Sequence, residues 1–316
     1  MNRLIFIPQY PVKMRYSEWW FTEFPRQFKK YFDEVIVIGK NYFKNEEATR
    51  GKNENFSPID SNIRFECAQI DEYLNVELSD NDILFLADIS FPGVFSSVLY
   101  HKPCSKMFVF CHATSANDFD YYMNVRPSKF TVETGHSLLF DKIFCGSNYS
   151  AKKVGWKNTE VVALPHPPSD IINPFPYIPK IHNIVSVCRP SVQKVTINIE
   201  DEIEKEFGNI ERQMFDNWHC YSKFLSSAKV LLITTKEDTF NNTIMDAIKC
   251  KCVPLAPRSL CFPEILDDEY LYSTIEELIK KIKEVLSGEL GTPKRMICHS
   301  LVDNFYQNVA FKMKEN

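Results

Sequence analysis

The sequence contains little glycine. Its nine glycines in 316 residues are under half of the usual share of about 7%. None of them forms a GxGxxG or GxxxxGK pattern, in which the missing side chain lets the backbone approach a phosphate closely. Dinucleotide folds with a glycine fingerprint, P-loop proteins and kinase-type glycine loops are therefore excluded. Any nucleotide bound by this chain must be held by other means.

Long apolar runs, CxxC pairs and a large net charge are also absent. The ten cysteines form no CxxC pair, which argues against a zinc site and indicates a reducing, cytoplasmic environment. The longest uncharged run, 89–101, is too short to cross a bilayer, and the apolar start at 4–8 is too short for a signal peptide. We expect no membrane partner. The net charge of −4 argues against general nucleic-acid binding but leaves a local basic face open.

Apolar runs alternate with amphipathic stretches along most of the chain. Strands are expected at 4–8, 35–38, 83–86, 107–110, 143–145, 183–187, 230–233 and 253–255. Helices are expected at about 17–32, 94–100, 243–249, 275–286 and 297–311, and a surface excursion at 40 to about 62. This alternation predicts an α/β fold with parallel sheets covered on both faces.

Prolines mark a change in the middle of the chain. Six of them lie between 165 and 179, a density that excludes a helix or a central strand and indicates a linker. We therefore predict a first Rossmann-like domain at 1–165, a proline-rich linker at 166–180 and a second Rossmann-like domain at 181–296. A helix in the last segment, 297–316, is expected to pack back on the first domain.

Polar residues follow predicted strands at their carboxyl ends, where open parallel sheets bind ligands. Arg189 and Lys194 come after the strand that ends at 187. Two permanent cations there can neutralise a diphosphate without a glycine loop, and a solvated turn is the alternative. His112 follows the strand that ends at 110, and a structural histidine is the alternative for it.

Two carboxylates follow the strand at 230–233. Asp238 precedes the helix expected at 243–249, where the helix dipole and exposed amides favour anions. Asp246 lies eight residues later, within that helix. The alternatives are a simple helix cap for Asp238 and a surface acid for Asp246.

Together these features resemble the retaining GT-B glycosyltransferases, which include glycogen-synthase-like and phosphatidylinositol-mannosyltransferase-like enzymes. In that family a strand ends in Arg-x4-Lys, as Arg189 and Lys194 do here, and a Glu-x7-Glu segment follows, where this chain has Asp238 and Asp246. A V-P-V strand and a Pro-Glu-Ile motif come next, matched here by Val253-Pro254-Leu255 and Pro263-Glu264-Ile265. Residues 252–274 are also similar to the tRNA-queuosine mannosyltransferases.

The resemblance implies a GT-B fold, with two Rossmann-like domains facing each other across a cleft. It implies a nucleoside-diphosphate sugar as donor, here a UDP-sugar, and no metal or other cofactor. Arg189 and Lys194 would hold the diphosphate and Asp246 the ribose, while Asp238, the backbone amides of 240–242 and His112 would meet the donor sugar. The implied nucleotide-sugar site comprises Arg189, Lys194, Asp238, Thr239, Phe240, Asn241, Asn242 and Asp246, and the implied catalytic residues are His112, Arg189, Lys194 and Asp238.

The chain departs from this family in three places. Both glutamates of the pair are aspartates, which are one methylene shorter, so the donor sugar or the activity is expected to differ. The glycine-rich first loop is replaced by residues 10–16. The segment between Lys194 and Ala228 is short, which leaves the pocket for the nucleotide base undefined.

Cations alternate with aromatic residues in the first domain, which suits a polyanion with a stacked or flipped base. The expected acceptor-binding residues are Lys13, Arg15, Tyr16, Trp19, Lys152 and Lys153, with Trp20, Trp156 and Lys157 nearby. An ordinary mixed surface with core tryptophans is the alternative.

The acceptor is predicted from composition and from the resemblance together. Enrichment in Lys, Asn, Ile and Phe resembles proteins of AT-rich genomes, phages among them, and the similar mannosyltransferases act on a nucleobase-linked hydroxyl. We therefore predict a monomer that glycosylates a 5-hydroxymethylpyrimidine in DNA. A tRNA base, a lipid, a polysaccharide or a small metabolite is the alternative acceptor, and a sugar-nucleotide-binding module without turnover is the alternative function.

Overall fold

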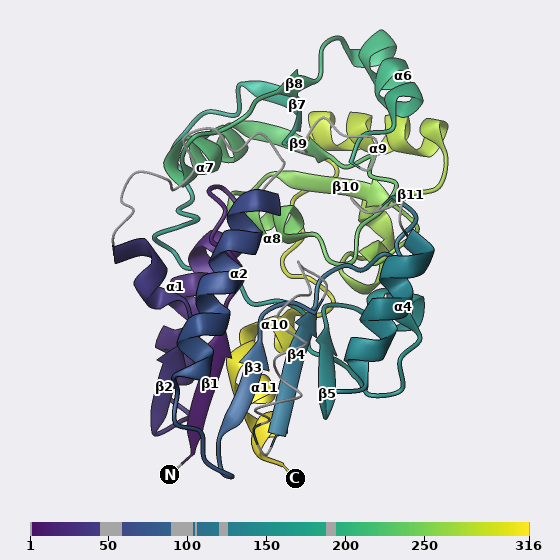
Figure 1. Ribbon diagram of the computed structural model, residues 1–316. Coiled ribbons are helices and arrows are strands. Elements are labelled where there is room, and N and C mark those ends of the chain that lie inside the picture. The colour runs from purple at the N-terminus through teal and green to yellow at the C-terminus, as the bar shows by residue number, and fades with distance from the viewer. Residues whose placement is uncertain are drawn as a thin grey trace.

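Two parallel β-sheets, one above the other in Figure 1, make up the protein. The computed structural model describes residues 2–44, 59–89, 104, 106–119, 126–187 and 194–315. The first sheet has the strand order β2-β1-β3-β4-β5-β6 and the second has the order β11-β10-β9-β7-β8. All the paired strands in these two orders run parallel.

The strands coincide with the apolar runs of the sequence. The first sheet contains β1 (Arg3–Ile7), β2 (Glu34–Val37), β3 (Ile83–Leu86), β4 (Lys106–Cys111), β5 (Lys142–Cys145) and β6 (Thr159–Val161). The second contains β7 (His182–Ser186), β8 (Glu211–Arg212), β9 (Ala228–Leu232), β10 (Val253–Pro257) and β11 (Leu271–Tyr272). Each strand predicted from the sequence is present, within about two residues of its expected bounds, whereas β6, β8 and β11 were not predicted because each has only two or three residues.

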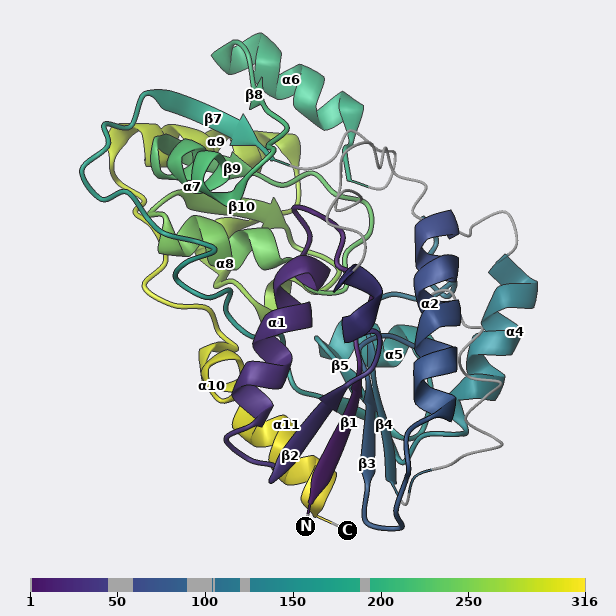
Figure 2. The same ribbon diagram turned by 60° about the vertical axis from the view of Figure 1, so that its left-hand side comes forward.

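Helices cover both faces of the first sheet. They are η1 (Lys40–Lys44), α1 (Tyr16–Phe28), α2 (Ile59–Leu74), α4 (Arg126–Ser137) and α5 (Asn148–Val154). Figure 2 shows α1 on one face of the sheet and α2 and α4 on the other. Side chains alternate accordingly, since Leu4 and Phe6 belong to the apolar cluster of α1, and Ile5 and Ile7 belong to the opposite cluster.

In the described part of the chain, the second sheet carries four longer helices, and two more follow it. They are α6 (Ile197–Phe207), α7 (Trp218–Ser226), α8 (Asn242–Lys249), α9 (Ile275–Ser287), α10 (His299–Asp303) and α11 (Phe305–Lys314), with the short turns η3 (Phe262–Glu264) and η4 (Asp268–Tyr270). Thr274 begins α9 as a cap that accepts from the Glu277 amide, and Gly288 ends it in the left-handed conformation. Within the described residues no helix is both long and apolar enough to span a bilayer.

Several helices differ from the sequence expectation. The surface excursion expected at 40 to about 62 ends in α2, which begins at Ile59 and whose buried face includes Asn62, Glu66 and Gln69. Polar residues on a buried face hide the apolar period of the helix, and α4 to α7 were not predicted either. The helix expected at 94–100 lies outside the described residues. The helix expected at 297–311 is two helices, α10 and α11, with Asn304 between them.

The chain passes between the sheets twice. Residues 162–181 connect β6 to β7 without helix or strand, and the segment after α9 returns the chain to the first sheet. There α11 packs on α1, where the Phe24 ring lies 5.5 Å from Phe305 and 5.4 Å from Tyr306. One buried apolar cluster therefore runs from Phe6 through Ile172 to Leu231. The domain boundaries at 165 and 181 stay a prediction.

Candidate functional site

A cleft of about 500 Å³ lies between the two sheets, at the carboxyl ends of their strands. Its first-sheet wall is formed by residues 12–16, Trp19 and residues 110–113. Its second-sheet wall is formed by Lys194, Tyr221 and residues 237–243 with Asp246. Strand order reverses between β1 and β3 in one sheet and between β7 and β9 in the other. Ligands of open α/β sheets bind at such reversals, and the residues that follow β1, β7 and β9 reach the cleft.

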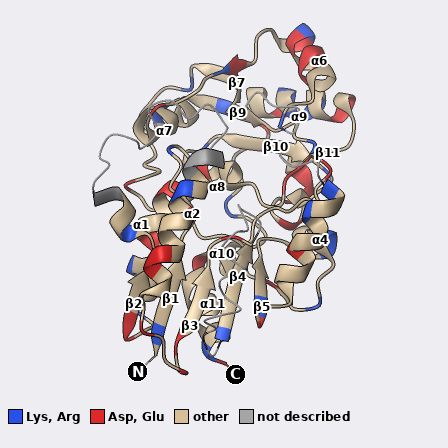
Figure 3. Ribbon diagram, viewed as in Figure 1, with Lys and Arg blue, Asp and Glu red and all other residues tan. Residues whose placement is uncertain are grey.

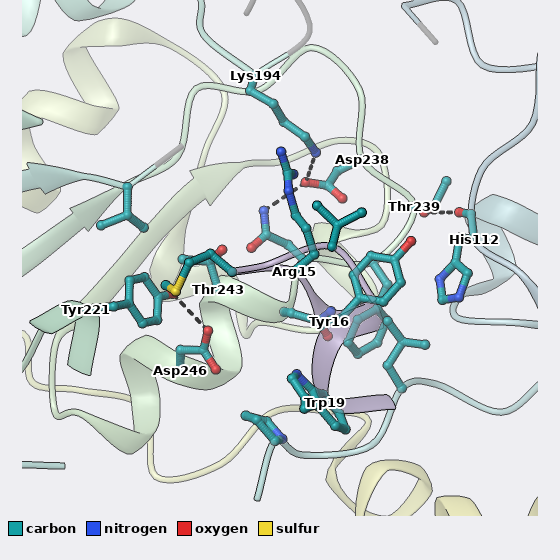
Figure 4. A pocket seen from close by; sticks show the side chains of 18 of the residues that line it. Arg15, Tyr16, Trp19, His112, Lys194, Tyr221, Asp238, Thr239, Thr243 and Asp246 are labelled. Atoms are coloured by element: carbon teal, nitrogen blue, oxygen red, sulfur yellow. Dashed lines mark hydrogen bonds and ion pairs between the residues drawn. The ribbon is translucent and has the colours of Figure 1, made fainter. Parts of the chain in front are cut away.

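A partly buried ion pair lies on the second-sheet wall (Figure 4). Lys194 Nζ donates to Asp238 Oδ2 at 2.7 Å, and the two side chains are 18% and 8% exposed. Asn241 Nδ2 donates to the same carboxylate oxygen at 2.8 Å. Asp238 does not cap α8, because the residue before that helix is Asn241. The ion pair instead holds a cation at the mouth of β7, where it can meet an anionic ligand.

Asp246 lies on the buried face of α8, so it is not a surface acid. Tyr221 donates its hydroxyl to Asp246 Oδ2 at 2.8 Å, whereas Oδ1 has no partner among the described residues. Burial raises the pKa of Asp246 to about 7, against the opposing effects of the Tyr221 hydrogen bond and the Lys249 charge. The carboxyl therefore changes charge near neutral pH.

His112 lies on the first-sheet wall among aromatic rings. Its ring stacks on Tyr16 at 4.5 Å and lies 4.6 Å from both Trp20 and Phe110. Burial lowers its pKa to about 3, although a hydrogen bond to the Ala87 backbone opposes this. The ring is therefore neutral. Since Nε2 has no partner among the described residues, Nδ1 makes the bond to Ala87, and Nε2 is left as an acceptor.

Hydrogen bonds join the two walls beside His112. Thr239 Oγ1 donates to the His112 carbonyl, and Ser147 Oγ donates to the Thr239 carbonyl at 2.5 Å. Phe240 packs so closely on Gly146 that a Cβ at this glycine would lie 3.0 Å from the Phe240 Cβ. This glycine is needed because the loop after β9 approaches the first sheet closely.

Unpartnered polar atoms gather in this cleft. Among the described residues that line it, four buried atoms have no hydrogen-bond partner: His112 Nε2, Asn241 Oδ1, Asn242 Oδ1 and Asp246 Oδ1. An unsatisfied buried polar group costs roughly 1–3 kcal/mol. A ligand rich in hydroxyl groups would supply the missing donors.

The sequence-predicted donor residues are brought together. Those that line the cleft are His112, Lys194, Asp238, Thr239, Phe240, Asn241, Asn242 and Asp246. Arg189 lies outside the described residues.

The predicted acceptor residues divide into two groups. Lys13, Arg15, Tyr16 and Trp19 line the cleft. Lys152 and Lys153 do not line it, because both lie on α5. Lys153 Nζ donates there to Asp118 Oδ2 at 2.9 Å.

The contacts of two glutamates were not predicted from the sequence. Glu237 is 2% exposed and accepts from Asn117 Nδ2 at 2.9 Å and from the Tyr149 hydroxyl at 2.7 Å. Glu264 accepts from the backbone amides of Asn148 and Tyr149 at 2.6 and 2.7 Å. Both glutamates tie the second sheet to the first. The Pro-Glu-Ile motif marked Glu264, but nothing in the sequence indicated its partners.

The arrangement of sheets is similar to that of several solved glycosyltransferases. The apo lipopolysaccharide outer core galactosyltransferase WaaB matches with a TM-score of 0.62 and 14% identity, covering 100% of this chain and 98% of that chain. Sucrose-phosphate synthase from Thermosynechococcus elongatus matches with a TM-score of 0.61 and 8% identity, covering 100% and 94%. Anabaena Alr3699/HepE, solved with UDP and glucose, matches with a TM-score of 0.59 and 13% identity, covering 98% and 95%.

The protein has the GT-B fold. This confirms the predicted fold class, two α/β halves with parallel sheets that face each other across a cleft. At identities of 8 to 14% these GT-B neighbours show the fold and not the reaction.

Sequence similarity is confined to part of the chain. No protein-family profile matches it. The tRNA-queuosine alpha-mannosyltransferase of Drosophila melanogaster is 32% identical over 104 residues, which are 31% of this chain and 26% of that protein. This confirms the local resemblance seen in the sequence. The match spans about a quarter of the fly protein's length.

Proposed function

We propose that this GT-B protein is a retaining glycosyltransferase that moves a sugar from a UDP-sugar to a hydroxyl on a modified nucleobase in nucleic acid. The observation that carries the proposal is the set of four unpartnered buried polar atoms, which lines the same cleft as the partly buried cation Lys194. A nucleoside-diphosphate sugar combines an anionic diphosphate with many hydroxyl donors. It therefore complements both features of the cleft.

The donor is assigned mainly to the second-sheet wall. Lys194, together with Arg189 on the segment outside the described residues, would hold the diphosphate. Asp246 would accept from a ribose hydroxyl through Oδ1, the oxygen that Tyr221 leaves free. Asp238, Asn241 and Asn242 would accept from sugar hydroxyls, and His112 Nε2 would do so from the opposite wall.

The proposed reaction needs no nucleophile from the protein. The bond between the sugar's C1 and the diphosphate oxygen breaks, and the acceptor oxygen bonds to C1 on the same face. The acceptor proton passes to the departing phosphate oxygen. Negative charge grows on that phosphate as the bond breaks, so a cation fixed beforehand, Lys194, lowers the barrier more than it stabilises the bound donor.

The acceptor is assigned to the first-sheet wall. Lys13 and Arg15 supply cations there and Tyr16 supplies aromatic surface, whereas Trp19 is only 4% exposed and packs in the core. Figure 3 shows red on α6, on the second sheet, where five of its eleven residues are acidic, but α6 does not line the cleft. Lys152 and Lys153 are not part of this proposal because they lie outside the cleft.

Within nucleic acid we propose 5-hydroxymethylpyrimidine in DNA as the acceptor. The matched fly protein is by name a tRNA-queuosine mannosyltransferase, which supports a nucleobase-linked hydroxyl and makes a tRNA base the second candidate.

Transfer to defined acceptors tests the proposal. The purified protein is incubated with UDP-glucose, UDP-galactose or GDP-mannose and with hydroxymethylated DNA, unmodified DNA or queuosine-containing tRNA. Mass spectrometry of the digested nucleosides follows. We expect one added hexose on the hydroxymethylated base alone. Addition to tRNA alone would move the acceptor, whereas UDP binding without transfer or hydrolysis would contradict the enzyme and favour a binding module.

A further inference from the structure

Three metal-ligating side chains meet where the chain passes between the two sheets. His166 lies on the connection from β6 to β7, and His299 and Asp303 lie on α10, on the return to the first sheet. Figures 1 and 2 both show α10 between α8 and α11. None of the three lines the cleft. Among the described residues they form the one His, Cys, Asp and Glu group whose ligand atoms could surround an ion.

The distances suit a small cation. His166 Nε2 lies 3.4 Å from Asp303 Oδ1, and His299 Nε2 lies 3.1 Å from Asp303 Oδ2. One ligand atom from each residue can be chosen so that all lie within 4.8 Å of one another. Ligands at the usual ~2.1 Å from a tetrahedral zinc ion are ~3.4 Å apart. A shift of about one ångström in side chains that are 38 to 47% exposed completes the geometry.

The backbone holds these three ligands in place before any ion binds, so binding would cost little conformational entropy. Pro165 and Pro167 flank His166 and are both buried, so the connection is fixed on either side of the ring. His299 and Asp303 are four residues apart on one helix, a spacing that puts their side chains on the same face. The positive charge of Lys249 opposes the binding of a cation here. Its Nζ donates to the Pro167 carbonyl at 3.4 Å and lies close enough to repel a positive charge on His166.

We propose that His166, His299 and Asp303 bind one zinc-class divalent ion. Two imidazoles and one carboxylate are ligands that suit zinc, nickel and cobalt rather than magnesium or calcium. The fourth position would be open to water. The bound ion would fasten the two connections between the sheets to each other, beside Pro167, which does line the cleft. The sequence predicts no metal, because these ligands lie on segments far apart in the chain.

Metal titration of the full chain tests this proposal without using catalytic activity. Protein stripped with a chelator is titrated at pH 7.5 with Zn²⁺ by calorimetry and with Co²⁺ by visible absorption. We expect one site in the micromolar range or tighter and a ligand-field spectrum for Co²⁺. His166→Ala and His299→Ala should each weaken binding at least tenfold, and the double variant should lose the spectrum.

A matched control separates this site from ordinary surface histidines. His182, whose Nδ1 lies 2.6 Å from Glu211 Oε2, also pairs with a carboxylate but belongs to no potential metal-binding group among the residues that the structure describes. His182→Ala should leave the affinity unchanged. Zinc should also raise the melting temperature of the parent protein but not that of the double variant.

Binding weaker than about 1 mM, or equal affinity in the parent and the double variant, overturns the proposal. If His166→Ala fails to fold, the Zn²⁺ affinity of His299→Ala alone tests the proposal. Because transfer to nucleic acid is never measured, failure of the glycosyltransferase assignment and failure of the metal site are separate results.

Discussion

The two walls of the cleft occupy equivalent places in two similar sheets but differ in chemistry. The second-sheet wall combines Lys194, Asp238 and Asp246 with amide side chains, and hydrogen bonds fix several of these groups. The first-sheet wall is built from stacked rings around His112, and Lys13 and Arg15 also line the cleft. Two sheets of the same topology therefore carry different walls: the second-sheet wall presents charged and amide groups, and the first-sheet wall presents aromatic rings. A donor with fixed charges and an acceptor with a planar base would divide between them in this way.

Removal of the Lys194 charge should have the largest effect on turnover, because it takes the cation from the second-sheet wall. With Lys194→Met we expect kcat to fall by about 100- to 1,000-fold, the usual effect of losing one group that stabilises transition-state charge. Turnover with saturating UDP-sugar is the measurement. Lys205→Met is the control, because this lysine is exposed and, within the described part of the chain, forms an ion pair only with Glu202 on its own helix.

The same substitution leaves Asp238 without its ion-pair partner, so the loss of stability must be measured separately from the loss of turnover. Loss of one partner of a fully buried pair costs roughly 3–5 kcal/mol, and a smaller loss is expected here because Lys194 is 18% exposed and Asn241 still donates to Asp238. The double variant Lys194→Met with Asp238→Asn removes both charges and should recover most of the melting temperature, but not the turnover. If turnover returned together with stability, Lys194 would have a purely structural role.

Asp246 should make the stability of the second-sheet wall depend on pH. Its pKa is 3.8 in the unfolded chain and about 7 in the folded protein. The folded state therefore holds an extra proton between these values, and stability falls as pH rises from about 4 to 7. Asp246→Asn removes this loss and should stabilise the protein by about 1–4 kcal/mol at pH 8, and hardly at pH 4. Denaturant unfolding at both pH values measures it, and an equal effect at both would contradict the buried, protonated carboxyl.

Donor affinity should follow the same titration. In the parent protein the KM for UDP-sugar should fall as pH rises through about 7, because the ionised Asp246 accepts from ribose more strongly. Asp246→Asn should raise KM about tenfold at pH 8, a change of about 1.4 kcal/mol, and flatten the profile. His112, whose pKa is about 3, should contribute no step between pH 5 and 8. A profile that keeps its step in Asp246→Asn would assign the titration to another group.

The smallest effect is expected on the first-sheet wall. Arg15→Ala should raise the KM for the nucleic-acid acceptor about fivefold, equivalent to about 1 kcal/mol, and leave UDP affinity unchanged. Lys152→Ala is the matched control, since this lysine lies on α5 outside the cleft. Equal losses in both variants would indicate general attraction to a polyanion and not a defined acceptor site.

The residues at strand ends show what the sequence can predict. His112, Lys194, Asp238 and Asp246 meet in one cleft because apolar runs mark the strands, and parallel topology brings the carboxyl ends together. The strands of three or fewer residues and the helix α2, with polar residues on its buried face, have no such period and were missed.

Contacts between distant segments are harder to predict. Glu237 bonds to Asn117, and Glu264 bonds to the start of α5, across more than a hundred residues each. Lys152 and Lys153 are predicted acceptor residues because cations alternate with aromatic residues in the first domain. On α5, Lys153 donates to Asp118, and proximity along the chain does not reveal that direction.

The packing of α11 on α1 has a consequence for synthesis on the ribosome. Phe305 and Tyr306 complete a ring cluster with Phe24 and Phe28, and Met313 is fully buried in the same apolar cluster. These residues are translated only after the entire second sheet. The side of α1 that α11 covers therefore stays exposed while more than a hundred further residues are added, and the nascent chain presents aromatic side chains that a chaperone can recognise.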